Sequence, residues 1–108
     1  RDFIYVKDCV SVILWILDNS SISGIFNCGT GQARSFKDLA MAMYSSINKQ
    51  PSIKYIEMPK NLKEQYQYFT EAKMDKIIEA GYHKKFIKLE DGIEDYVQNY
   101  LSNKRTYR

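Results

Sequence analysis

Two short segments near the start of the chain constrain its fold most. Residues 1–8 read RDFIYVKD, and residues 24–31 read GIFNCGTG. The aromatic and β-branched centre of the first segment favours an extended strand, and Asp8 is suited to capping a following helix. Apolar residues then recur with the spacing of one helix face, at positions 10, 13, 14 and 17. The second segment predicts a short buried strand that closes at its glycines.

The rest of the sequence continues this alternation and predicts an α/β fold. Ser35 is followed three residues later by Asp38, which is a capping-box pattern for a helix start. Gly81 is suited to the position just after a helix end. The expected strands cover residues 3–6, 25–27 and 52–58, and a loop covers 60–69. The expected helices run from Asp8 to about Asn19, from Ser35 to before Pro51, from Thr70 to Gly81, and onward from about Leu89.

The composition is that of one globular domain without unusual charge. The chain has 108 residues, 44% of them hydrophobic, and a formal net charge of +3 from 16 basic and 13 acidic residues. Lys104, Arg105 and Arg108 at the C-terminus account for this small excess, so charge does not indicate nucleic-acid binding. We expect no nucleic-acid partner.

The sequence carries no sign of a membrane segment. No apolar run reaches the roughly 18 residues that span a bilayer, and the N-terminus lacks a signal-peptide layout. We therefore expect a cytoplasmic protein with no membrane partner. The chain starts at Arg1, without methionine and inside a strand-like segment, which we interpret as a piece of a longer polypeptide.

The cysteines and the single histidine do not predict a metal site. Cys9 and Cys28 lack the C-x-x-C spacing, and with His83 they fall short of a four-ligand zinc set. We expect both cysteines to be reduced, buried and neutral, because their neighbours are apolar. His83 follows Gly81 beside two lysines and is expected to face solvent.

The turn at Gly29 and Gly31 resembles a phosphate-binding loop in position but not in detail. The third glycine of a G-x-G-x-x-G fingerprint would fall at Arg34, whose side chain prevents close packing of helix on strand. No acidic ribose ligand follows another strand at the expected distance. We interpret this segment as a tight strand-to-helix turn, and we assign no cofactor-binding residue to the chain.

Arg1 and Tyr66 are candidates for binding an anionic ligand, although their residue types alone do not decide it. A guanidinium presents a rigid fork of donors suited to phosphate, although a terminal arginine is usually solvated. Tyr66 lies with Tyr68 and Phe69 in a loop. Such a cluster can stack on a base, donate a hydrogen bond to a phosphate, or cover the core, which is the commonest use.

A resemblance to a known family adds to this reading. The RDFIYVKD and IFNCGTG segments resemble the second half of an extended short-chain dehydrogenase/reductase. The segment YQYFTEA at residues 66–72, and AGY at 80–82 with Phe86, are similar to one branch, the ADP-glycero-manno-heptose 6-epimerases of lipopolysaccharide synthesis. The similarity runs nearly end to end, to about Leu101.

The resemblance implies a fold and a site. Residues 1–108 would comprise the last elements of a Rossmann-type sheet and a C-terminal substrate-binding lobe, with the NADP-binding half absent. In the family, the arginine that matches Arg1 contacts the diphosphate, and the tyrosine that matches Tyr66 contacts the substrate. Gln65 stands where some relatives carry arginine. Phe69 would pack inward, and Thr70 would cap the next helix.

The resemblance also implies a reaction. NADP would take hydride from C6 of the heptose of ADP-heptose and return it to the opposite face, with no net redox change. The cofactor loop and the Y-x-x-x-K catalytic pair belong to the absent half, and no Y-x-x-x-K occurs here. The chain alone is therefore expected to hold no catalytic residue, to lack activity and to bind no metal. The parent is expected to form a homo-oligomer.

Two alternatives stay open from the sequence. Another extended member, such as a 4-epimerase or dehydratase, would share Arg1 and the Asn27 to Gly29 turn but should lack the tyrosine-glutamine loop. A non-catalytic relative would use the fold to bind a nucleotide or a protein partner, and should lack the Y-x-x-x-K pair upstream.

Overall fold

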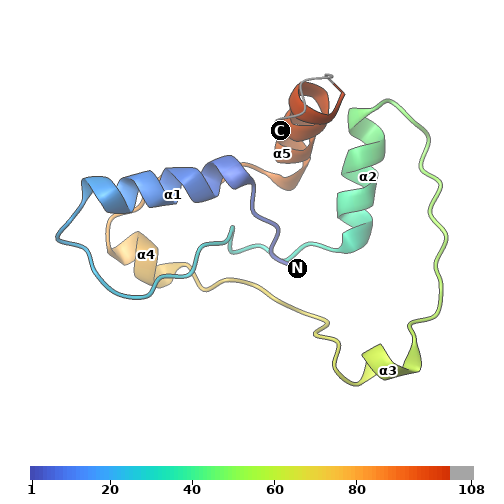
Figure 1. The fold of residues 1–108 in the computed structure, drawn as a ribbon, viewed down its shortest axis with the longest axis horizontal. Coiled ribbons are helices and arrows are strands. Elements are labelled where there is room, and N and C mark those ends of the chain that lie inside the picture. The colour runs from blue at the N-terminus through green and yellow to red at the C-terminus, as the bar shows by residue number, and fades with distance from the viewer. Residues whose placement is uncertain (103–108) are drawn as a thin grey trace.

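The structure is a computed structural model and describes residues 1–102, so the basic C-terminal tail lies outside the described residues. Within that range the chain is helical (Figure 1). The helices are α1 (Val6–Asp18), α2 (Phe36–Ser46), α3 (Lys60–Lys63), α4 (Asp75–Glu79) and α5 (Leu89–Tyr96), which continues as the π-helical turn η1 (Val97–Leu101). Irregular segments connect them.

The strands predicted at residues 3–6, 25–27 and 52–58 are not formed within residues 1–102. A single antiparallel bridge joins Asp2 to Ala33. A strand needs a neighbouring strand for its backbone hydrogen bonds, and these segments have none among the described residues. Ile25, expected in a buried strand, is 87% exposed, and Ile56, expected in the third strand, is 82% exposed.

The first helix begins two residues before the predicted cap. Tyr5 precedes α1 with extended backbone and makes no side-chain cap bond. Asp8 therefore lies inside the first turn, and its expected role as helix cap is wrong. Its buried carboxylate accepts a hydrogen bond from the Ile87 backbone amide at 2.8 Å. This contact ties α1 to the segment that leads into α5.

Two helix boundaries follow the sequence signals closely. The capping box of α2 is confirmed, because Ser35 Oγ accepts from the Asp38 amide and Asp38 accepts from the Ser35 amide, each at 3.0 Å. Gly81 ends α4 with φ of 107°. Its amide donates to Ile78 and the Tyr82 amide donates to Ile77, the paired bonds of a Schellman end.

The buried core lies between α1 and α4, which Figure 1 shows next to each other. Val12, Met74, Ile77 and Tyr82 form it, and Trp15 packs edge-on against Tyr82 with ring centroids 5.3 Å apart. Helix α4 starts at Asp75, so the predicted start at Thr70 is wrong. Residues 70–74 instead approach the core as an irregular segment.

Helices α2 and α5 form a second packed pair, side by side in Figure 1. Lys7 connects α1 to this pair through an ion pair of 2.7 Å with Asp95. The Lys7 hydrogen bond, with help from Tyr5 and Asn99, lowers the pKa of Asp95 to about 2. An apolar groove of about 510 Å³ lies between the helices, lined by residues such as Phe3, Leu39 and Ile93.

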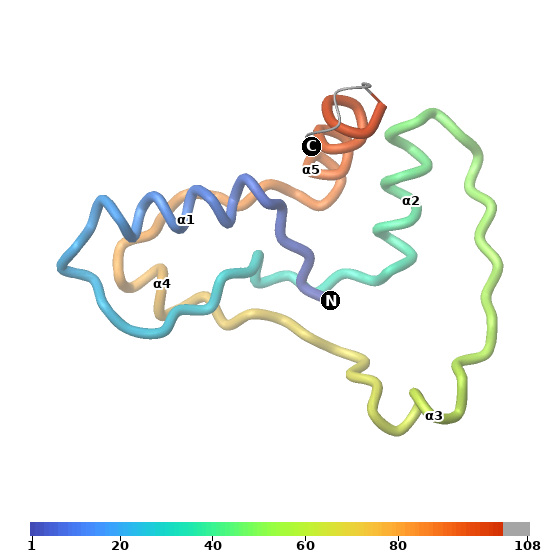
Figure 2. The backbone as a smooth tube through the Cα atoms, viewed as in Figure 1, coloured from blue at the N-terminus to red at the C-terminus, as the bar shows by residue number. Residues whose placement is uncertain are grey.

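The described chain is open. Its radius of gyration is 16.9 Å, against about 13 Å for a compact domain of this length. Its accessible surface is 9054 Å², against roughly 6,200 Å² for a compact monomer of this mass. The segment after α2 runs far out to α3, and the segment after α3 returns toward α4 (Figure 2). One face of α1 is also exposed, through Val6, Val10, Ile13, Leu14 and Leu17.

This exposed apolar surface leads to the first prediction. The isolated chain should self-associate as its concentration rises, because contiguous apolar faces of this kind associate in water. Sedimentation velocity over a wide concentration range measures it, and a compact monomer throughout would contradict the prediction. Leu14→Gln with Leu17→Gln should reduce association, whereas Asp18→Asn at the end of the same helix should leave it unchanged.

Candidate functional site

The structure brings together the two residues singled out as ligand-binding candidates. The Cζ atom of Arg1 lies 5.3 Å from the ring centroid of Tyr66, which is a cation-π arrangement. Arg1 Nη1 also donates a hydrogen bond of 2.8 Å to Thr70 Oγ1, 69 positions away in the sequence. The guanidinium is thus held by the Tyr66 ring and by the Thr70 hydroxyl. Within residues 1–102 this is its one side-chain hydrogen bond, so its other N–H groups remain available to a ligand.

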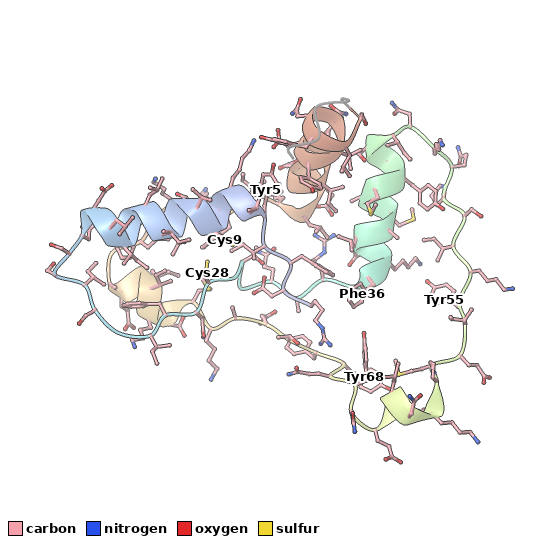
Figure 3. All side chains as sticks on the ribbon, in the orientation of Figure 1. Tyr5, Cys9, Cys28, Phe36, Tyr55 and Tyr68 are labelled. Atoms are coloured by element: carbon pink, nitrogen blue, oxygen red, sulfur yellow. The ribbon has the colours of Figure 1, made fainter. Side chains whose placement is uncertain are left out.

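The loop around Tyr66 is aromatic and exposed. Tyr68 packs edge-on against Tyr66, with centroids 5.2 Å apart, while 70% of its own surface is exposed (Figure 3). Phe69 is 65% exposed, so the expectation that it packs inward is wrong for these residues. Gln65 is likewise exposed. The loop has no core to cover here, which leaves its rings free to meet a ligand.

The backbone of Arg1 is fixed by the segment that enters α2. The main-chain nitrogen of Arg1 donates to the Arg34 carbonyl at 2.7 Å, and the Arg34 amide donates to the Arg1 carbonyl at 2.8 Å. These two bonds flank the bridge between Asp2 and Ala33. The arginine side chain therefore leaves the backbone from a fixed point.

Asp2 binds the neighbouring loops to this point. Its Oδ1 accepts from the Thr30 amide at 2.8 Å and from the Thr30 hydroxyl. Its Oδ2 accepts from the amides of Gly31 and Ala72, each at 3.0 Å. Burial acts to raise the pKa of Asp2, but these four hydrogen bonds outweigh it and hold the pKa below 3.8. Asp2 therefore has a structural role, as the acceptor that holds these amides in place.

The glycine turn does not fit a dinucleotide. The amides of Thr30 and Gly31, which a phosphate loop would offer to its ligand, are already donated to Asp2. A Cβ at Gly29 would lie 2.6 Å from Asp2 Oδ2 and 2.5 Å from the Ala72 side chain. Glycine is therefore needed here for close approach of the carboxylate, and the turn serves the fold rather than a cofactor.

Arg34, at the third glycine position of that fingerprint, is used in ion pairs. Its guanidinium contacts Glu90 at 2.5 Å and Asp38 at 3.4 Å, which joins the start of α2 to the start of α5. The hydrogen bond from Arg34 lowers the pKa of Glu90. Because these two carboxylates neutralise it, Arg34 is a weaker candidate than Arg1 for binding an anion.

The cysteines and the histidine take no catalytic arrangement. Both cysteines are free thiols, but Cys28 is exposed and Cys9 half-buried, so the expectation that both are buried is wrong. Figure 3 shows them next to each other. Cys28 is exposed as a whole, but partial desolvation of its thiol, and then contact with Cys9, raise the pKa of Cys28 to about 11, which keeps it neutral. His83 is exposed, as expected.

The described part of the chain contains neither a metal-binding cluster nor a membrane-spanning helix. In residues 1–102 no cluster of three or more histidine, cysteine, aspartate or glutamate side chains is arranged to hold a metal ion. No helix in that range has the length and apolar character needed to cross a membrane.

Sequence reasoning missed one member of the site, Thr70. A threonine ahead of an apolar run signals a helix cap, and that signal concealed its contact with Arg1. Sequence spacing alone gives no sign of a contact over 69 positions. The fixed threonine of the epimerase motif was the available hint.

The chain is similar in sequence to known bacterial enzymes. No protein-family model matches the chain. Over 94% of its length the chain is 51% identical to the ADP-L-glycero-D-manno-heptose-6-epimerase of Nitratidesulfovibrio vulgaris strain DP4. Over 99% of its length it is 50% identical to the protein of that name from Fusobacterium nucleatum subsp. nucleatum. The resemblance found in the motifs is confirmed.

The match covers only part of these relatives. The chain spans 32% of the first protein and 34% of the second, so it corresponds to about a third of an epimerase. This share is consistent with a C-terminal part of such an enzyme.

The Asp2 cluster generates a stability prediction. Asp2→Asn replaces acceptor oxygens with an amide that cannot accept all four bonds, so the free energy of unfolding should fall by about 1–3 kcal/mol at neutral pH. Thermal unfolding followed by circular dichroism at low concentration measures this. Asp18→Asn, the same change at an exposed position, should have little effect. Equal stability of the two variants would contradict the prediction.

The same carboxylate should give stability an acid limit. Because the pKa of Asp2 is lowered in the folded chain, its contribution is complete above 3.8 and is lost as the pH falls through the lowered value. The stability difference between the unmodified chain and Asp2→Asn should therefore shrink below about pH 4. A difference that is constant from pH 7 to pH 3 would show that the charge of Asp2 is not involved.

The occupied glycine turn leads to a binding prediction. NADP titrated into the isolated chain should give no saturable heat at micromolar concentrations, since Asp2 already takes the amides that a phosphate needs. A one-to-one isotherm by titration calorimetry would contradict it.

Proposed function

We propose that this chain is the substrate-anchoring part of an ADP-heptose 6-epimerase, in which Arg1 and Tyr66 hold the diphosphate side of the nucleotide-sugar. The observation that carries the proposal is the contact between these two side chains. Each matches a fixed position of the epimerase motifs, and the contact forms although 65 positions separate the two residues in the sequence. The names of the similar proteins support the same assignment.

The contact suits a diphosphate for electrostatic reasons. The guanidinium carbon lies over the Tyr66 ring, and an arginine binds phosphate oxygens through the N–H groups of its planar fork. A cation-π contact restrains the arginine without using up these N–H donors. The Tyr66 hydroxyl adds a donor that can reach the same substrate.

This anchoring would serve catalysis by position. Inversion at C6 of the heptose requires that carbon to lie against a reacting group, and a firm grip on the remote diphosphate supplies binding energy for this alignment. The proposal assigns NADP and the catalytic residues to the rest of the polypeptide, because the glycine turn of this chain does not fit a dinucleotide. The isolated chain would bind the nucleotide-sugar without catalysing its epimerisation. The complete enzyme would act in lipopolysaccharide synthesis.

The tyrosine-glutamine loop favours this assignment over other nucleotide-sugar enzymes. A 4-epimerase or dehydratase of the extended family should keep Arg1 but lack Tyr66 and Gln67. Here both are present, and Tyr66 contacts the arginine. A relative that only binds a partner protein would have no need for the paired arrangement.

Arg1→Ala in the complete enzyme tests the proposal. The loss of a charge-assisted contact should lower kcat/KM for ADP-heptose about ten- to a hundredfold, while the affinity for NADP stays unchanged. Steady-state epimerisation and NADP titration measure the two quantities. Lys49→Ala removes an equal charge from an exposed position and should behave as the unmodified enzyme.

Tyr66→Phe separates the ring from the hydroxyl. The ring stays over Arg1 and one neutral donor is lost, so kcat/KM should fall only about two- to tenfold. Tyr66→Ala loses both and should cost more. Unchanged kcat/KM for Arg1→Ala would refute the assignment, and a selective loss of NADP affinity would show that the site binds the other ligand.

A further inference from the structure

The hydroxyl of Thr70 is placed for a task that the proposed function does not assign. It is not used as a helix cap, since α4 begins at Asp75 and its N-cap position is Met74. It instead accepts the 2.8 Å hydrogen bond from Arg1 Nη1. The carbon of the same guanidinium lies over the Tyr66 ring, 5.3 Å from its centroid. One short loop thus contacts the arginine twice, through the Tyr66 ring and the Thr70 hydroxyl.

We propose that Thr70 is a positioning residue, which fixes the rotation of the Arg1 guanidinium so that its unpaired edge meets the diphosphate. This inference rests on the proposed function of Arg1. The cation-π contact keeps the guanidinium near the Tyr66 ring but does not decide which of its N–H groups face a ligand. The hydrogen bond from Nη1 to Thr70 fixes that orientation. The ordering of a flexible arginine is then complete before the ligand binds, which strengthens binding.

The backbone next to Thr70 is anchored on the same segment as Arg1. The Glu71 carboxylate accepts from the Ala33 amide at 2.8 Å, and the Ala72 amide donates to Asp2 at 3.0 Å. Both contacts lie beside the bridge that fixes Arg1. The donor and the acceptor of the positioning bond are therefore tied to one frame, so the bond does not depend on the outer part of the loop.

The chemistry of the bond selects the test variants. Thr70→Val keeps the shape of the side chain and removes the acceptor, whereas Thr70→Ser keeps the acceptor. In the complete enzyme, Thr70→Val should raise the KM for ADP-heptose about three- to tenfold with a smaller change in kcat, because the grip on the diphosphate is weakened while the reacting groups are untouched. Thr70→Ser should restore a KM close to that of the unmodified enzyme.

A double-variant cycle separates positioning from a general effect on the loop. If Thr70 acts through Arg1, Thr70→Val should add nothing in an Arg1→Ala background. A Thr70→Val effect of undiminished size in that background would overturn the inference. So would an unchanged KM for Thr70→Val in an enzyme that Arg1→Ala impairs, and this outcome would leave the proposed function standing. Wild-type kinetics for Arg1→Ala would overturn both.

Discussion

The carboxylate of Asp2 is the contact on which the arrangement of the loops depends. It accepts four hydrogen bonds, from Thr30, Gly31 and Ala72, and so joins three segments that are far apart in sequence. Unpaired backbone amides are costly when shielded from water, and a charged acceptor satisfies several of them at once. The cluster needs glycine at position 29, where a Cβ would meet the carboxylate. The cluster therefore requires both the carboxylate of Asp2 and the absence of a side chain at Gly29.

Asp8 repeats the same device at the other end of the first segment, where its buried carboxylate accepts from the Ile87 amide. Within residues 1–102, hydrogen bonds from backbone amides to carboxylates thus connect distant segments, as strand pairing does in a sheet. A ladder satisfies one amide per residue but needs two extended partners in register. A carboxylate needs only that amides converge on it. Irregular segments can therefore be held in place without regular strands, as they are around Arg1.

The difference between local and distant constraints explains which features the sequence predicted. The Ser35 capping box and the Gly81 helix end involve residues a few positions apart, and both are confirmed. The strands at 25–27 and 52–58 required partners that the described residues do not supply, so aromatic and β-branched composition alone was misleading. Asp8 carries the signature of a helix cap, but a distant amide uses its oxygen instead. Composition shows which segments are able to form a strand or a cap, but whether they do so depends on which distant group they contact.

The candidate site shows the same division. Arg1 and Tyr66 were singled out because each lies in a segment that resembles the epimerases, but their contact depends on a fold that brings residues 1–2 against residues 70–72. That fold is set by Asp2, the neighbour of Arg1 in the chain. Asp2 holds the backbone of the two segments together, and the guanidinium of the adjacent Arg1 contacts Thr70 and Tyr66. The anchor of the fold and the anchor of the ligand are consecutive residues, so a change that loosens the Asp2 cluster should also disorder the guanidinium. Stability and ligand capture in this chain are therefore coupled through two neighbouring side chains.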